Sequence, residues 1–418
     1  ISEEKFFPKN NIVKYLKVRG SYGEVGNDQI GGDRFLYLPS SYGAASDSGV
    51  NKYNFGLASN PYTSLMIVEN KIGNPDLTWE KAKKMNVGVD INLFNNCLTA
   101  SFDIFKEKRN NILANRSTSP MIIGANLPAY NFGEMENRGW EMDLNFRHHI
   151  QDFHYWARFN YSFARNEIIY MDEVQKRYDY QMTTGRRKNQ FFGLIFDGYY
   201  NSWEEINALD RPKSSWSGNQ LQPGDVKYID VNQDGVIDDY DMVPIGYTPV
   251  PEIIYGFSFG AQYKGFDFSI LFQGADNVSI KYFGRSMWPF AKGEESAKSL
   301  IKERWTQERY EAGEKITFPR LSLNPNGETD HNYRPSTLWI RDASYLRLKN
   351  LEVGYTFTGG FVKRLNLNSV RLYFNGSNLF TWTDVVDLDP EAPSRSGNVE
   401  INTYPLQKVY NIGLNINF

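Results

Sequence analysis

The chain has 418 residues, and its 46 Lys and Arg against 49 Asp and Glu give a formal net charge of -3. This balance lacks the basic excess that follows nucleic-acid phosphates, so nucleic acid is not an expected partner. The mean hydropathy of -0.54 and the absence of any apolar run of about 18 residues exclude transmembrane helices. They do not exclude a membrane β-barrel, because alternating strands hide their hydrophobicity in an average.

Cysteine and histidine are scarce. The single cysteine, Cys97, excludes an internal disulfide, and we expect it at a strand end as a small apolar residue. The four histidines are His148, His149, His154 and His331. We expect no zinc site, because the sequence has no Cys and His clusters at ligand spacing.

Ten segments, in chain order, alternate apolar and polar residues with the period of two that is typical of β-strands. They are 12–23, 79–94, 97–109, 138–148, 153–166, 254–263, 266–274, 342–357, 369–380 and 408–418. In the last segment one face carries Tyr410, Ile412, Leu414, Ile416 and Phe418, and Asn or Gly occupies every position between them. Each strand is predicted to have one apolar and one polar face, at a length of about 9–11 residues that suits a tilted bilayer crossing.

The connections between these segments alternate between long and short. Asn95–Asn96, residues 148–152 and Lys264–Gly265 are short, residues 358–368 are moderate, and the other links are long, with 166–251 the longest. A soluble β-sandwich has no reason to segregate loop length by side, whereas outer-membrane barrels have short periplasmic turns and long extracellular loops. We therefore predict an all-β fold, a transmembrane antiparallel β-barrel with its apolar face toward lipid. Because about ten strands enclose a lumen that side chains fill, these long loops indicate part of a larger barrel.

Several stretches resemble, in this order, the C-terminal half of SusC/RagA-like TonB-dependent outer-membrane transporters. They are NPDLTWEKAKKMNVGVDINLF, ENRGWEMDLNF, PGDVKYIDVNQDGVIDDYDMVPIG, YGFSFGAQYKGFDFSILFQG, ASYLRLKNLEVGYTF and VRLYFNGSNLFTWT. The opening ISEEKFF resembles a mid-barrel turn of the same family. The resemblance implies that residues 1–418 supply about ten strands of a 22-stranded barrel. It places the plug domain, the TonB box and the first barrel strands outside this sequence.

The resemblance also implies a location in the bacterial outer membrane and TonB-dependent import of oligosaccharides or peptides. The implied partners are a SusD-like surface lipoprotein as lid, the remainder of the barrel and its plug, TonB through the N-terminal part, and the lipid bilayer. A dimer of SusC–SusD pairs is expected. A passive porin and a soluble Ca²⁺-dependent glycan-binding β-sandwich are the alternatives, and the sequence does not separate glycan from peptide cargo.

One motif in the 166–251 loop has the spacing of a Ca²⁺ loop. In DVNQDGVIDDYD, at 230–241, oxygen ligands alternate and Gly235 permits the sharp turn. The predicted ligands are Asp230, Asn232, Asp234, Val236 through its carbonyl, Asp238 and Asp241. Because Asp241 replaces the usual Glu and the flanks are not helical, a solvated Asp- and Gly-rich loop is the alternative. Bound Ca²⁺ would be a structural cofactor that rigidifies the loop near the partner lipoprotein.

Other residues are weaker candidates for a functional role. Loop tryptophans could stack on sugar rings, although membrane-interface anchoring or loop packing is the favoured interpretation for each. They are Trp203, Trp216, Trp288, Trp305 and Trp382. No nucleophile–base set or carboxylate pair stands out, so we expect no catalysis and assign no substrate-binding residues.

Overall fold

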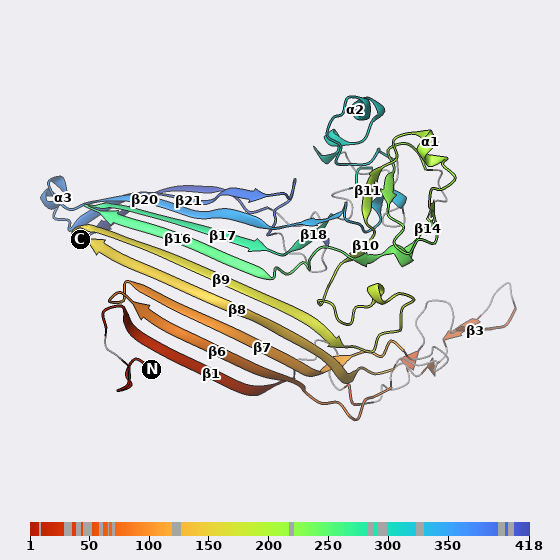
Figure 1. Ribbon diagram of the computed structural model, residues 1–418, viewed down its shortest axis with the longest axis horizontal. Helices are drawn as coiled ribbons and strands as arrows, with labels where there is room; N and C mark the ends of the chain where they lie inside the picture. The colour runs from red at the N-terminus through yellow and green to blue at the C-terminus, as the bar shows by residue number, and fades with distance from the viewer. Residues whose placement is uncertain are drawn as a thin grey trace.

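Ten long strands form one antiparallel sheet in the computed structural model (Figure 1). In sheet order they are β1 (Val13–Asn27), β6 (Glu80–Leu93), β7 (Leu98–Ala114), β8 (Tyr130–Ile150), β9 (Phe153–Tyr170), β16 (Ile253–Tyr263), β17 (Phe266–Asp276), β20 (Tyr345–Phe357), β21 (Ser369–Thr383) and β23 (Val409–Asn417). The structure describes residues 1–7, 10–28, 36–38, 43–44, 52–57, 62–65, 67–68, 72–118, 127–216, 221–282, 288–290, 299–322, 330–391, 398–399 and 405–418.

The ten predicted segments correspond one to one with these ten strands, so the predicted all-β antiparallel fold is confirmed. The boundaries are wrong at one end of β7, β8 and β9, which extend beyond the predicted segments. In these extensions charged residues such as Glu136 and Glu167, which pair across β8 and β9, replace the apolar residues of the alternating pattern. The backbone ladder therefore continues where the hydrophobic signal has ended.

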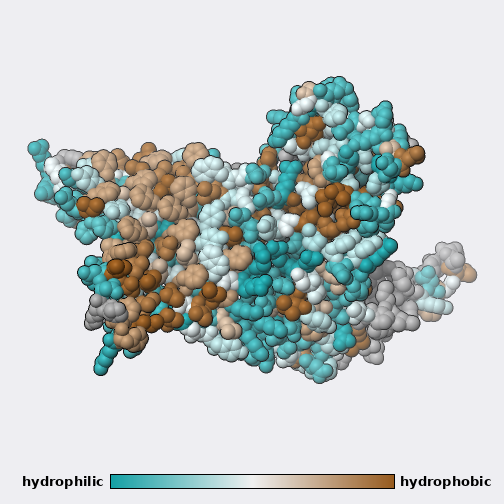
Figure 2. Space-filling view, viewed as in Figure 1, coloured by the Kyte–Doolittle hydropathy of each residue, from teal (hydrophilic) through white to brown (hydrophobic). Residues whose placement is uncertain are grey.

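The strand register places the apolar side chains on one face of the sheet. Val89 pairs with both Val18 and Phe102, and Phe102 pairs in turn with Met142. This face is open to its surroundings, because the side chain of Ile412 in β23 is 81% exposed. Figure 2 shows apolar surface along the strands toward the end of the sheet that carries α3 (Phe361–Arg364). The predicted lipid-facing surface is therefore present.

Short turns join the strands at the end of the sheet that carries α3. Lys264 and Gly265 have φ angles of 43° and 93°, the two left-handed conformations of a type I′ hairpin, whose twist matches that of the strands. Gln151 and Asp152 join β8 to β9. Cys97 lies in the turn between β6 and β7, next to the first residue of β7 as predicted.

The long connections gather at the opposite end and build a compact unit there (Figure 1). Its apolar core consists of Leu194, Tyr199, Val226, Tyr228, Ile237, Val278, Ile280, Tyr282, Trp288, Trp305, Phe318, Tyr333, Leu338, Trp339, Ala343 and Val385. These residues come from the three connections β9–β16, β17–β20 and β21–β23. We call the unit around this core the external subdomain.

Short elements complete the connections. In the external subdomain these are β10 (Phe192–Gly193), β11 (Phe196–Tyr199), α1 (Trp203–Ile206), β12 (Lys213–Ser214), β13 (Val226–Tyr228), β14 (Val236–Ile237), β15 (Val243–Pro244), β18 (Ser279–Tyr282), α2 (Gln307–Glu311), β19 (Ile340–Asp342) and β22 (Asn398–Val399). The β1–β6 connection contains β2 (Gly43–Ala44), β3 (Lys52–Phe55), β4 (Tyr62–Leu65) and β5 (Ile67–Val68). None of the helices in the described residues is long and apolar enough to span a membrane.

The face assignment predicts opposite effects for two neighbouring residues of β23. Leu414 pairs with Leu372 on the apolar face, and Asn415 pairs with Arg371 on the polar face. Leu414→Arg should destabilise the barrel by about 2–4 kcal/mol at mid-bilayer depth, because it places a cation in lipid. Asn415→Asp should have little effect. Folding yields of the two variants in bilayers test this, and equal yields would contradict the face assignment.

Candidate functional site on the polar face

An arginine network spans the first three strands on the polar face. Arg19 in β1 pairs with Gly88 in β6, which pairs with Asp103 in β7. The Arg19 guanidinium donates to Asp90 at 3.0 and 3.1 Å and to Asp103 at 2.6 Å. A Cβ atom at Gly88 would lie only 2.7 Å from Arg19 Cζ. Glycine at this position therefore leaves room for one arginine to bridge two carboxylates on neighbouring strands.

A second network near the other edge of the sheet uses the same arrangement. Arg371 in β21 binds both Asp267 in β17 and Glu352 in β20, with a distance of 2.6 Å from its Nη2 to Glu352 Oε1. The intervening residue Gly354 would bring a Cβ atom to 2.6 Å from the same Nη2. The polar face thus holds paired charges along its width, which is compatible with a water-filled lumen.

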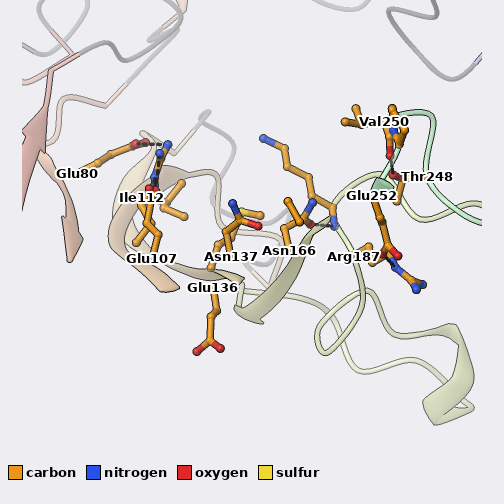
Figure 3. A pocket seen from close by; sticks show the side chains of 15 residues that line it. Glu80, Glu107, Ile112, Glu136, Asn137, Asn166, Arg187, Thr248, Val250 and Glu252 are labelled. Carbon is orange, nitrogen blue, oxygen red and sulfur yellow. Dashed lines mark hydrogen bonds and ion pairs between the residues drawn. The ribbon is translucent and has the colours of Figure 1, made fainter. Parts of the chain in front are cut away.

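A cavity of about 370 Å³ lies where β6 to β9 meet the segment that leads into β16 (Figure 3). It is lined by Glu80, Glu107, Arg109, Ile112, Met135, Glu136, Asn137, Ala164, Asn166, Arg187, Lys188, Thr248, Val250, Pro251 and Glu252. In Figure 3, Glu136 points away from the side of the sheet on which Glu107 and Asn137 lie. The cavity therefore belongs mainly to the polar face.

Charges in this cavity are paired yet partly exposed. Arg109 donates to Glu107 at 2.8 Å, and its side chain is 41% exposed. Lys84 approaches Glu107 at 3.3 Å from the same face. Because partly exposed ion pairs contribute little to stability, these groups can exchange their partners for the charges of a ligand.

Glu252 fixes the loop that closes one side of the cavity. It is 5% exposed and accepts hydrogen bonds from Arg165 at 2.9 and 2.8 Å, from Arg187, and from Asn277 at 3.1 Å. These partners come from β9, from the β9–β16 connection and from the start of the β17–β20 connection. One buried carboxylate therefore joins three chain segments at the end of the sheet that lies nearer the external subdomain.

Buried polar groups hold the external subdomain together. Asn332 donates to Asp225 at 2.7 Å and accepts from the Val226 amide at 2.9 Å, and Arg320 forms an ion pair with Asp225 at 2.6 Å. Removing one partner of such a buried charge pair is costly, because the other charge is left uncompensated. This cluster links the β9–β16 and β17–β20 connections.

His331 is part of the same buried region. Its Nε2 lies 2.7 Å from the Val226 carbonyl oxygen and its Nδ1 lies 2.9 Å from Ser214 Oγ. Because a carbonyl only accepts, Nε2 carries the proton and donates. Burial lowers the pKa of the His331 imidazole, although the hydrogen bond to the Val226 carbonyl and the nearby Asp225 oppose this.

The six residues of the predicted Ca²⁺ site lie together in one loop closed by side-chain to backbone hydrogen bonds. Asp230 accepts from the Gly235 amide at 2.8 Å, Asp234 accepts from the Val236 amide at 3.0 Å, and Asn232 accepts from the Asp234 amide at 3.0 Å. These are turns of the kind that Asp and Asn favour. Asp238 caps the turn that follows by accepting from the Tyr240 amide at 2.7 Å.

Asp241 is placed differently from a surface ligand. It is fully buried, and its carboxylate accepts from the amides of Val231, Asn232 and Asp238 at 2.8, 3.3 and 2.9 Å. Burial raises the pKa of Asp241, and the amide hydrogen bonds oppose the shift. Within the described part of the chain, no group of three or more His, Cys, Asp or Glu residues is arranged to hold a metal ion. Ca²⁺ binding therefore stays a prediction.

Three of the five candidate tryptophans pack in or against the core of the external subdomain. Trp288 and Trp305 are buried in the core of the external subdomain, and Trp216 packs against that core with Arg334 at 4.0 Å over its ring. Trp203 and Trp382 are each 53% exposed, and the prediction that Trp382 lies in a loop is wrong, because it belongs to β21. Loop packing, the favoured interpretation, is confirmed for the first three.

A continuous antiparallel sheet with an exposed apolar face and a charged opposite face defines the wall of an outer-membrane β-barrel. The sequence matches the family described as TonB dependent receptor-like, beta-barrel, over residues 2–379. The chain belongs to this family. The resemblance to SusC/RagA-like transporters and the outer-membrane location are confirmed, and the soluble β-sandwich alternative is ruled out.

Named relatives cover the whole chain. It is 27% identical to TonB-dependent receptor P3 of Formosa agariphila and 26% identical to TonB-dependent receptor SusC of Bacteroides thetaiotaomicron, over 100% of this chain but only 41% and 39% of those proteins. Among solved structures, the RagAB peptide transporter matches with a TM-score of 0.71 at 24% identity, over 99% of this chain and 42% of that one. The structural match establishes the fold, and the chain spans about two fifths of the length of the curated relatives it matches.

The buried histidine predicts a pH dependence of the external subdomain. Because the folded state lowers the His331 pKa, the unfolded state binds the proton more readily below the ordinary value of about 6.5. The contribution of neutral His331 to the stability of the external subdomain is then fully present above that pH and falls as the pH drops below it. Resistance of the extracellular loops to proteolysis should therefore decrease between about pH 7 and pH 5.

Two histidine variants serve as controls for this pH dependence. His331→Gln keeps a donor for the Val226 carbonyl but does not titrate, so its proteolysis should vary less with pH. His154→Gln, at the exposed start of β9, should behave like the unaltered protein. Identical pH profiles for the protein and His331→Gln would contradict the assignment.

Proposed function

We propose that the chain forms part of the wall of a TonB-dependent importer of oligosaccharides or peptides in the bacterial outer membrane. The observation that supports this most strongly is the polar face, on which the Arg19 and Arg371 networks and the cavity present charge away from lipid. In a large barrel such a face lines an aqueous lumen. The named relatives SusC and RagAB support nutrient import.

The rest of the barrel is proposed to come from further strands of the same longer protein. Among the described residues, β1 and β23 each pair with a long strand on one side only. An open edge leaves backbone donors and acceptors unpaired, which lipid does not tolerate. A 22-stranded barrel with a plug and a TonB-binding segment would close both edges.

A SusD-like lipoprotein is proposed to cover the extracellular mouth. The external subdomain stands at the end of the sheet away from the short turns (Figure 1), where an extracellular partner would dock. Its own core and the buried Asp225 cluster give that platform a fixed shape. The kind of partner, a SusD-like lipoprotein, is inferred from the family resemblance.

The cavity favours a charged cargo such as a peptide over a neutral glycan. Its lining combines carboxylates and cations with apolar side chains such as Ile112 and Val250, and none of the described residues that line it is aromatic. A peptide offers both charges and apolar groups to such a surface. Arg109 and Lys188 are the cations we propose to contact cargo carboxylates.

This proposal predicts the behaviour of a double variant of the complete transporter. Arg109→Gln with Lys188→Gln should weaken uptake of a labelled acidic peptide by about a hundredfold or more, since each of the two lost charged hydrogen bonds contributes about 1.5–3 kcal/mol. Arg147→Gln, at the opposite end of β8, removes one positive charge away from the cavity and should leave uptake unchanged. Uptake should stop when the proton gradient is collapsed. Uptake that persists without the gradient would instead support the passive porin.

Ca²⁺ is proposed to rigidify the 230–241 loop as a structural ion. The ligand spacing supports it, as does Asp230 Oδ1, which is buried and has no hydrogen-bond partner in the described part of the chain. A cation there would bring together the carboxylates of Asp230, Asp234 and Asp238 and the Val236 carbonyl. The ion would compensate the concentrated negative charge of this loop.

Limited proteolysis of the complete transporter tests the Ca²⁺ proposal. Cleavage within residues 221–252 should slow at about 1 mM Ca²⁺ compared with chelator, because extracellular modules bind Ca²⁺ in this range. Asp230→Asn should remove the protection. Asp210→Asn, an exposed change in the same connection, should keep it. Equal cleavage rates with Ca²⁺ and with chelator would contradict an ion at this loop.

A further inference from the structure

The apolar face ends, toward the external subdomain, in a row of large apolar side chains. Ile104 in β7 pairs with Trp140 in β8, and Trp140 pairs with Phe163 in β9. In β9 the outward positions from Phe153 to Phe163 cover eleven residues, about the length that crosses a bilayer at a tilt. This row therefore lies at the outer boundary of the hydrocarbon layer, where aromatic residues are enriched.

On β7, β8 and β9 the next outward row consists of basic residues. Lys106 pairs with Arg138, and Arg138 pairs with Arg165. Like charges directly opposite one another destabilise a sheet. The following row, Lys108 with Glu136 and Glu167, has mixed charge. The sequence therefore concentrates positive charge at one depth, immediately beyond the lipid-facing surface.

Two further arginines join this row from the β9–β16 connection. A cavity of about 400 Å³ is lined by Arg138, Arg165, Asn166, Glu167, Gly185, Arg186, Arg187, Gln190, Pro244 and Gly246. Backbone hydrogen bonds hold the loop beside β9, since the Ile168 amide donates to the Arg186 carbonyl and the Gly185 amide donates to the Ile168 carbonyl, each at 2.8 Å. Four guanidinium groups thus share one hollow, which we call the arginine hollow.

The charges of the arginine hollow are only partly neutralised. Glu252 takes up Arg165 and Arg187 in its hydrogen bonds. Glu167 lies 3.9 Å from Arg138, at the limit of an ion pair. The Arg186 side chain has no hydrogen bond or ion pair within the described residues. Two arginines, Arg138 and Arg186, therefore remain able to bind an external anion.

We propose that the arginine hollow binds a phosphate group on the headgroup of an outer-leaflet glycolipid. Guanidinium groups bind phosphate oxygens through paired N–H donors, so two arginines in one hollow match a single phosphate. Lys106 is already paired with Glu136 at 2.9 Å, and the bound phosphate also offsets the repulsion between Arg138 and Arg165. This binding depends on the outer-membrane location and on neither cargo nor TonB.

The position selects a lipid headgroup over a free anion. Arg138 and Arg165 lie on the same face as Trp140 and Phe163, two residues further along each strand. They therefore lie at the depth of the lipid headgroups, next to the hydrocarbon that Trp140 and Phe163 contact. Arg165 also stacks over the Phe163 ring at 5.4 Å, which holds the cation against the apolar boundary. A cargo anion in the lumen would approach from the opposite face, where the arginine hollow shares Asn166 and Arg187 with the cavity of the polar face.

Native mass spectrometry of the complete transporter in detergent tests this proposal, with purified lipid A as the probe. Arg138→Gln with Arg186→Gln should raise the apparent Kd for phosphorylated lipid A about tenfold, because each basic residue at such a surface contributes to headgroup affinity. Lipid A stripped of its phosphates should bind the unaltered protein as weakly as phosphorylated lipid A binds the double variant. Arg138→Lys with Arg186→Lys, which keeps the charge, should retain part of the affinity.

Matched controls decide between the outcomes. Arg147→Gln, in the same strand but at the opposite end, should bind lipid A as the unaltered protein does. If the double variant does not fold, Arg186→Gln alone carries the test, because that side chain makes no bond in the described structure, and it should weaken binding several-fold. Equal affinities of the unaltered protein and the arginine variants would overturn the proposal. Displacement of lipid A by an equal concentration of inorganic phosphate would overturn the choice of a lipid headgroup.

Discussion

The backbone hydrogen-bond ladder is the constraint on which the rest of this structure depends. In a bilayer no water can satisfy an amide or a carbonyl, so each long strand must pair along its membrane-crossing length. The pairing fixes a register, and the register decides which side chains face lipid. A shift of one residue between β1 and β6 would separate Arg19 from Gly88 and turn one strand's apolar side chains toward water. The two faces of the sheet are therefore consequences of one pairing pattern.

Charge on the polar face is organised to keep that pairing intact. Arg19 and Arg371 each cross a glycine to reach carboxylates on neighbouring strands, so one cation bridges two anions at each place in the wall. Arg347 extends the principle to the loops, because it is buried and binds Asp389 at 2.7 Å and Glu391 at 3.1 Å in the β21–β23 connection. The same chemistry thus joins strands within the wall and anchors the loops above it.

The sequence predicted the features that depend on a period of two and missed those that depend on distant contacts. The alternation of Leu414 and Asn415 identified both the strand and its faces. No local pattern marks His331 as buried, because its partners Ser214 and Val226 lie more than a hundred residues away. The Asp230–Asp241 motif predicted a compact loop, which is present, but its spacing could not reveal that Asp241 is buried among backbone amides.

Strand β8 shows how one sequence meets three environments in turn. Its outward positions run from Phe146 through Trp140 to Arg138 and then Glu136, which follows the order of hydrocarbon, headgroup layer and water. The inward positions are polar along the same stretch, as in Asp143, Glu141 and Asn137. Hydrophobic alternation therefore had to end at Arg138 although the strand continues to Tyr130. The point at which the sequence signal stops marks the depth at which the surroundings of the outer face change, and not the end of the strand.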